Sequence, residues 1–172
     1  MKKTNESLGF ITCGSDYIAS IKVPYLERRN IRIKSKNLLN DRFKGFKATL
    51  GWRNLSRSWI EYYKEALLLL LQSNVEIKLY NAANNTINEI MDEMDVDRSY
   101  ISDLLLVNQN KRDNLYYVKK EESIINQLGT LVCGVYGYVE NIAKDPEINS
   151  AKAQLTKFAF DNNIEEKVKF IR

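Results

Sequence analysis

The chain has 172 residues, of which 44% are hydrophobic and 28% are charged, a composition typical of a globular protein that excludes wholesale disorder. It contains no histidine and only two cysteines, which excludes imidazole catalysis, histidine metal sites and a disulfide framework. No apolar run reaches the roughly 20 residues of a membrane helix, and no signal-peptide core follows the first residues. We therefore expect a cytosolic protein with no membrane partner, cofactor or metal.

The first third of the chain is basic and is predicted to form strands. Residues 8–23 read as one or two strands that break at a turn over 14–16. Residues 30–37 alternate isoleucines with cations, a period of two that predicts a half-buried strand with a cationic polar face. These patterns predict a short, basic, β-rich N-terminal region over residues 1–53.

The charge of this region indicates a surface for a polyanion. Residues 1–60 hold thirteen basic and four acidic residues, a net charge of +9, whereas the remainder is net −5. The candidate contact residues for nucleic acid are Arg28, Arg29, Arg32 and Lys34. The alternative is an ordinary solvated face whose cations pair with the acidic part of the same fold.

Aromatic residues are interleaved with cations between residues 42 and 54. Phe43, Phe46 and Trp52 alternate with lysines and arginines, a combination that suits single-stranded or flipped bases. The alternative is that all three rings belong to the core, which is the commoner position of such residues.

The remainder of the chain is predicted to be mainly helical. Apolar residues at helical spacing predict a helix over 54–73, and residues 75–85 fit either a short strand or a second helix. Residues 119–144 begin as a helix whose three glycines would let another backbone approach, and a last helix is expected over 146–162. The predicted fold is mainly α (α+β): the basic β-rich region, followed by a helical domain over 54–172, in one compact unit.

One short pattern resembles an enzymatic site. Glu76 and Lys78 have the E-x-K spacing of metal-dependent nucleases, in which the carboxylate binds Mg²⁺ and the lysine assists water. That site also needs an aspartate on a neighbouring strand, and the nearest upstream aspartate, Asp41, precedes a long helical pattern. We therefore expect no enzymatic activity.

Residues 84–107 contain the one motif of known type. Thr86 and Glu89 form a capping box that begins a helix at Ile87, and Asp95 occupies a position that requires a left-handed backbone. The segment resembles the helix-turn-helix of bacterial DNA-binding regulators, T-x-x-E-I-A-x-x-L-G-V-S-x-x-x-I-S. The positions that match are Thr86, Glu89, Ile90, Met94, Val96, Ile101 and Ser102. Met91 replaces a small residue of that pattern, and Asp95 replaces its glycine.

The resemblance implies DNA contacts from the second helix of the unit, 86–107. The implied contact residues are Arg98, Ser99, Tyr100 and Ser102, and Lys111 and Arg112 follow directly. The same segment carries six carboxylates against one arginine, which repel phosphates. DNA binding here therefore requires that the N-terminal cations lie alongside.

These patterns favour a DNA-binding regulator or accessory protein of a bacterium or mobile element, acting as a homodimer on duplex DNA. Two alternatives remain at this point. One is a non-enzymatic helical module that binds a protein partner through its divided charge. The other is an RNA-binding protein that uses the basic, aromatic-rich N-terminal third.

Overall fold

A four-stranded mixed sheet forms the centre of the computed structural model, which describes residues 7–14, 16–94, 123–141 and 150–171. The strand order is β1-β2-β3-β4. The β1–β2 and β2–β3 pairs are antiparallel and β3–β4 is parallel. The strands are β1 (Ser7–Cys13), β2 (Tyr17–Pro24), β3 (Glu76–Asn81) and β4 (Val168–Ile171).

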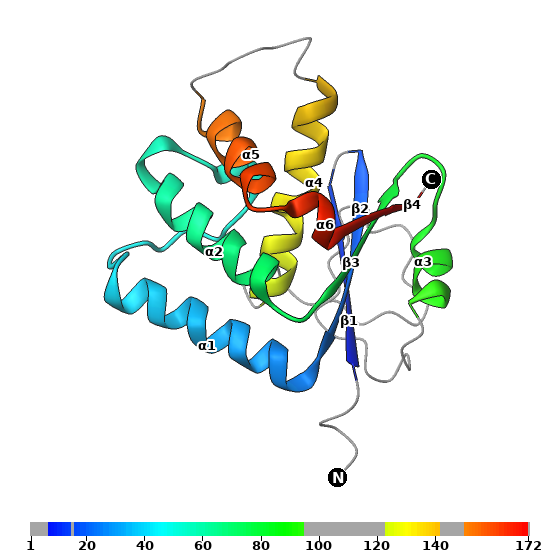
Figure 1. Ribbon diagram of the computed structural model, residues 1–172, viewed down its shortest axis with the longest axis horizontal. Helices are drawn as coiled ribbons and strands as arrows, with labels where there is room; N and C mark the ends of the chain where they lie inside the picture. Colours follow the sequence, from blue (N-terminus) through cyan, green and yellow to red (C-terminus); the bar gives the residue numbers. More distant parts are fainter. Residues whose placement is uncertain (1–6, 15, 95–122, 142–149, 172) are drawn as a thin grey trace.

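Helices cover the two faces of this sheet unequally. One face carries a thick layer made by α1, α2, α4 and α5, whereas α3 lies on the other face (Figure 1). Two single 3₁₀ turns precede α2, at Trp52–Asn54 and Arg57–Trp59. The helices are α1 (Tyr25–Asp41), α2 (Ile60–Gln72), α3 (Ile87–Glu93), α4 (Ile124–Asn141), α5 (Ala151–Asp161) and the short α6 (Ile164–Lys167).

The hairpin of β1 and β2 confirms the strands predicted over residues 8–23. Phe10 pairs with Ile21, and Ile21 pairs with Ile77 of β3, so these three side chains form one row that faces the thick helical layer. The alternate residues Ile18 and Tyr80 pair with each other and face α3. Both faces of the central strands are therefore apolar, which is the pattern of a sheet covered on both sides.

The predicted fold class is wrong in its arrangement, because the structure is an α+β fold with strands from three separate parts of the chain. β3 and β4 come from the region that was expected to be a helical body, and the basic N-terminal region contributes the long helix α1. One core cluster includes buried residues from Leu8 to Val168 and thus joins both sides of the predicted boundary at residues 53 and 54.

The strand predicted over residues 30–37 is also wrong, because these residues belong to α1. Only Ile31 and Ser35, one helical turn apart, are buried in this helix, and Ile33 is 46% exposed. A helix with so few buried positions exposes Arg32, Lys34 and other cations. Over a short stretch of sequence, the isoleucines and these cations then alternate as they would in a half-buried strand.

The other predicted elements are confirmed with narrower bounds, and one strand was missed. α2, α4 and α5 lie inside the expected helices. Of the two alternatives for residues 75–85, the strand is the correct one, because they contain β3. The closing residues were assigned to the predicted helical domain, but Val168–Ile171 pairs with β3. Four residues carry too little periodicity to reveal a strand, and their pairing depends on a neighbour far away in sequence.

The glycines of α4 allow close contact with side chains rather than with another backbone. A Cβ on Gly129 would lie 2.6 Å from Thr12 Oγ1 and 2.9 Å from Thr12 Cβ, so α4 approaches β1 closely there. At Gly134 the ring of Trp52 occupies the position where a Cβ atom would lie. Gly137 is different, because a Cβ there would meet only Asp16 Oδ2 at 3.9 Å.

This difference predicts opposite effects of one substitution at two positions of α4. Gly129→Ala is expected to lower the free energy of unfolding by about 1–3 kcal/mol, because the added methyl group overpacks the contact with Thr12. Gly137→Ala is expected to raise it by about 0.5–1 kcal/mol, because alanine is the better helix former and has room. Urea denaturation of both variants measures the difference, and equal changes would contradict the close approach of α4 to β1.

Candidate nucleic-acid interface

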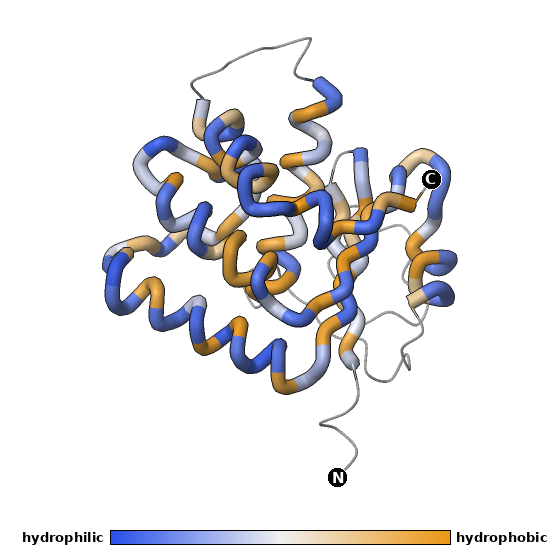
Figure 2. The backbone as a smooth tube through the Cα atoms, viewed as in Figure 1, coloured by the Kyte–Doolittle hydropathy of each residue, from blue (hydrophilic) through white to orange (hydrophobic). Residues whose placement is uncertain are grey.

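Four cations lie on the outer side of α1 and define what we call the α1 basic surface: Arg29, Arg32, Lys34 and Lys36. All four side chains are exposed. The helix follows β2 directly, since Pro24 ends the strand and is the N-cap residue of α1. Figure 2 shows hydrophilic residues recurring along the whole length of α1.

None of these four cations forms an ion pair or a hydrogen bond with another residue in the described part of the chain. The neighbouring cations differ. Arg28, the fourth predicted contact residue, is half-buried with its guanidinium 5.6 Å from the centroid of the Phe10 ring. Arg42 pairs with Glu65 of α2. Arg28 and Arg42 thus contact the fold, whereas the α1 basic surface is open to a ligand.

The segment that resembles a helix-turn-helix lies partly in the described structure. α3 begins at Ile87 as predicted, and the capping box is formed: Glu89 N–H donates to Thr86 Oγ1 at 3.3 Å and Thr86 N–H donates to Glu89 Oε2 at 3.1 Å. The turn at Asp95 and the predicted contact residues lie outside the described residues. These contact residues are Arg98, Ser99, Tyr100, Ser102, Lys111 and Arg112.

The sheet separates α3 from the α1 basic surface. Ile90 and Met91 pack with Ile11 and Ile18 on one sheet face, while Ile31 of α1 packs into the core on the other (Figure 1). The exposed residues of α3 include three acids, Glu89, Asp92 and Glu93. The structure therefore does not bring the predicted N-terminal cations alongside the described part of the helix-turn-helix-like segment.

The aromatic residues of the basic region pack into the fold. The ring centroids of Phe46 and Tyr62 are 4.6 Å apart, and those of Phe43 and Tyr62 are 5.2 Å apart. Trp52 lies against Gly134 of α4. All three rings are partly buried and pack against the core cluster, which favours the core alternative.

The E-x-K pattern forms no metal centre in the part of the chain that the structure covers. Glu76 and Lys78 lie on one side of β3 and pair with each other, with Lys78 Nζ 3.5 Å from Glu76 Oε1. Asp41 ends α1 in the thick helical layer. Across the described ranges, no three acidic or cysteine side chains come together as metal ligands would.

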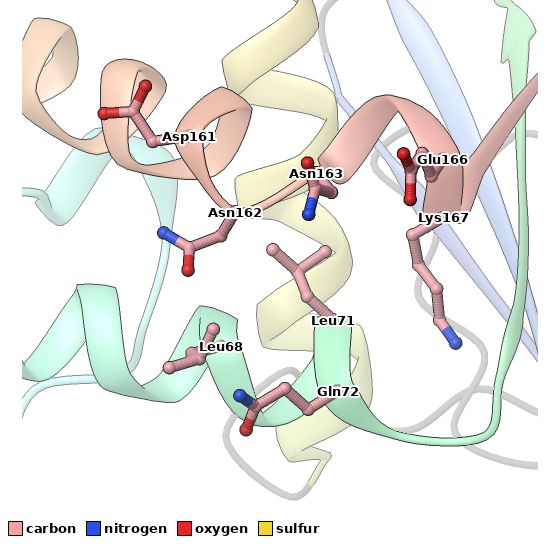
Figure 3. Close-up of a pocket in the computed structure, with 8 residues that line it drawn as sticks. All are labelled: Leu68, Leu71, Gln72, Asp161, Asn162, Asn163, Glu166 and Lys167. Atoms are coloured by element: carbon pink, nitrogen blue, oxygen red, sulfur yellow. The ribbon is translucent and has the colours of Figure 1, made fainter.

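A cavity of about 450 Å³ lies between the end of α2 and the connection from α5 to α6. Figure 3 shows Leu68, Leu71 and Gln72 on the α2 side of this cavity. On the opposite side two of the polar groups have partners in the chain: the Asn162 amide donates to the Phe158 carbonyl at 2.8 Å, and the Lys167 ammonium donates to the Ser73 carbonyl. These contacts hold the connection from α5 to α6 in place.

Comparisons with protein-family models, with curated proteins and with solved structures found no match to this chain. Among the helices that the structure describes, none has both the length and the apolar character needed to cross a membrane.

Tyr80 lies between the sheet and α3, and its environment favours the neutral phenol. Burial, and then the nearby Glu93 carboxylate, raise the pKa of its hydroxyl from 10.0 to about 12. In the unfolded chain the same hydroxyl titrates near its ordinary value. The folded protein therefore retains a proton that the unfolded chain loses between pH 10 and about pH 12.

This pKa shift predicts a loss of stability at alkaline pH. Above pH 10 the unfolded state binds fewer protons, so the free energy of unfolding is expected to fall as the pH rises toward about 12. Tyr80→Phe should make this fall shallower, because residue 80 then no longer ionises. Urea titrations of both proteins between about pH 9 and 12 measure the two slopes, and identical slopes would contradict the role of Tyr80.

Proposed function

We propose that this protein binds duplex DNA through the α1 basic surface, as a regulator or accessory protein of a bacterium or mobile element. The observation that carries the proposal is the set of four exposed cations on one helix, none of which has a partner in the described structure. Unpaired cations release counterions when they meet phosphates, and this release supplies most of the affinity for a nucleic acid.

The dimensions of α1 support a duplex as the ligand. The helix has 17 residues, which at 1.5 Å per residue is a rod of about 25 Å, and its outer side is free of other described elements along that length. A rod of about 10–12 Å diameter fits the major groove of B-DNA, which is about 12 Å wide. The major groove of double-stranded RNA is too narrow and deep for the same contact.

The packing of the aromatic residues also favours a duplex over a single strand. Single strands bind where aromatic faces stand open beside cations. Phe43, Phe46 and Trp52 instead contact other side chains of the fold. These partly buried rings therefore offer a single strand less stacking surface than the RNA-binding alternative requires.

A protein partner is the second candidate, and a specific observation favours it. Leu26 and Ile33 are 55% and 46% exposed, two turns apart on α1 among the cations. Apolar contacts surrounded by cations would also suit an acidic protein surface. The predicted homodimer and cytosolic location stay predictions, and DNA contacts from residues 98–112 are the alternative to contacts from α1.

The salt dependence of binding tests the proposal. Each phosphate contact contributes about 0.9 to the slope of log affinity against log salt concentration. Replacing Arg32 and Lys36 by glutamine is therefore expected to reduce that slope by about 1–2 and to weaken binding to all duplexes alike. Fluorescence anisotropy with a mixed-sequence duplex, between about 50 and 200 mM salt, measures it.

A matched pair of substitutions controls for total charge. Lys157→Gln with Lys169→Gln removes the same two charges from exposed positions on α5 and β4. This pair is expected to leave the slope nearly unchanged. The proposal fails if the full chain binds no duplex at the lowest salt concentration, or if both pairs of substitutions have the same effect.

Substitution of Arg98, the base contact implied by the helix-turn-helix resemblance, tests which surface binds DNA. Arg98→Ala is expected to change duplex affinity less than twofold, roughly the scatter of such measurements, because the acids of α3 just before it repel phosphates. A loss of about 5- to 150-fold, with relaxed preference at one base pair, is the effect of removing a guanine contact. That result would assign base reading to the helix-turn-helix-like segment instead.

A further inference from the structure

We propose that the outer face of α1 reads adenine–thymine base pairs in the major groove, with Asn30 and Asn37 as the two adenine contacts. This inference rests on the proposed binding of duplex DNA and adds the class of sequence that is bound. It follows from the order of side chains around the helix rather than from its total charge.

One exposed stripe along α1 is uncharged. Because 3.6 residues make one turn, side chains spaced by four, three and four residues share one face. The residues with this spacing are Leu26, Asn30, Ile33 and Asn37, and Asn40 continues the stripe in the last turn of α1; all five are exposed. The stripe lies opposite the buried pair of Ile31 and Ser35.

Cations flank this stripe on its two sides. Arg29, Arg32 and Lys36, spaced by three and four residues, follow one side of it, and Lys34 lies on the other. The side with Lys34 has the lower positive charge, because Glu27 and Asp41 lie on it as well. In a groove, this arrangement turns the stripe toward the base edges and the cations toward the phosphates of the two walls.

The chemistry of the stripe selects adenine–thymine pairs. An asparagine amide offers one acceptor and one donor, which match the N6 donor and N7 acceptor of adenine. Within the described structure neither Asn30 nor Asn37 uses its amide in a hydrogen bond. Leu26 and Ile33 supply apolar contacts of the kind that thymine methyl groups accept. The stripe holds no arginine or lysine, the usual readers of guanine.

The spacing of the two amides sets the spacing of the bases. Seven residues separate Asn30 from Asn37, a rise of about 10.5 Å along the helix axis. Base pairs follow one another at about 3.4 Å, so the two contacts are about three base pairs apart. The preferred sequence is therefore expected to carry two adenines at that separation, with thymines between or beside them.

The test is selection of bound sequences by the full chain from a pool of randomised duplexes. The wild-type protein should enrich duplexes with two adenine–thymine positions about three base pairs apart. Asn30→Ala should relax the preference at one position and Asn37→Ala at the other. Each variant should lower affinity for the selected duplex by about 5- to 150-fold, the usual worth of a bidentate base contact.

An asparagine outside the stripe provides the matched control. Asn88 is likewise exposed in a helix, but it lies on α3 across the sheet, so Asn88→Ala should leave both affinity and preference unchanged. Alanine is a better helix former than asparagine, so none of these substitutions is expected to unfold its helix. Circular dichroism of each variant verifies this.

Two different failures can be told apart. If the wild-type chain binds no duplex at low salt, the proposed function itself is wrong. If it binds with the expected salt dependence but the pool shows no such pattern, α1 contacts only phosphates and the inference is wrong. The inference is also wrong if Asn30→Ala and Asn37→Ala behave like Asn88→Ala.

Discussion

The packing of α4 against β1 and β2 is the interaction on which the rest of the structure depends. This helix is apolar on almost every side. Its apolar side chains are therefore shielded from water only if other elements surround the helix. The sheet covers one side, and α1, α2 and α5 contact the others. Gly129 allows the close approach to Thr12, whose hydroxyl donates to Asn126 Oδ1 at 2.8 Å and satisfies a buried polar group.

The position of α1 at the outside of this layer follows from the same packing. Since α4 occupies the centre, α1 lies at the outside of the layer, where Ile31 and Ser35 are buried and Tyr25, Leu38 and Leu39 pack against the core while partly exposed. The side of α1 that faces away from this contact carries the cations. α3 packs on the opposite sheet face and carries exposed acids, so the sheet separates the two sets of opposite charge. Among the described residues, the cations of α1 and the acids of α3 therefore lie on opposite sides of the sheet.

Several features were predictable because their causes are local. The β1–β2 hairpin follows from apolar runs around a turn, α2 from its wide apolar stripe, and the start of α3 from the capping box of Thr86 and Glu89. The basic character of the candidate interface was also visible, since charge depends on composition alone. Three of the four predicted N-terminal contact residues, Arg29, Arg32 and Lys34, are exposed on α1 and have no partner in the described structure.

The amino-acid sequence by itself determined the charge division, the hairpin, the main helices and the absence of histidine chemistry, because these depend on residue type and near neighbours. Only the tertiary structure decided that residues 30–37 are helical, that Val168–Ile171 is a strand, and that Phe43 and Trp52 are packed into the fold. It also decided that α1 and α3 lie on opposite sides of the sheet. In each case the deciding contact comes from a distant part of the chain, and burial against it outweighs the small differences in local propensity.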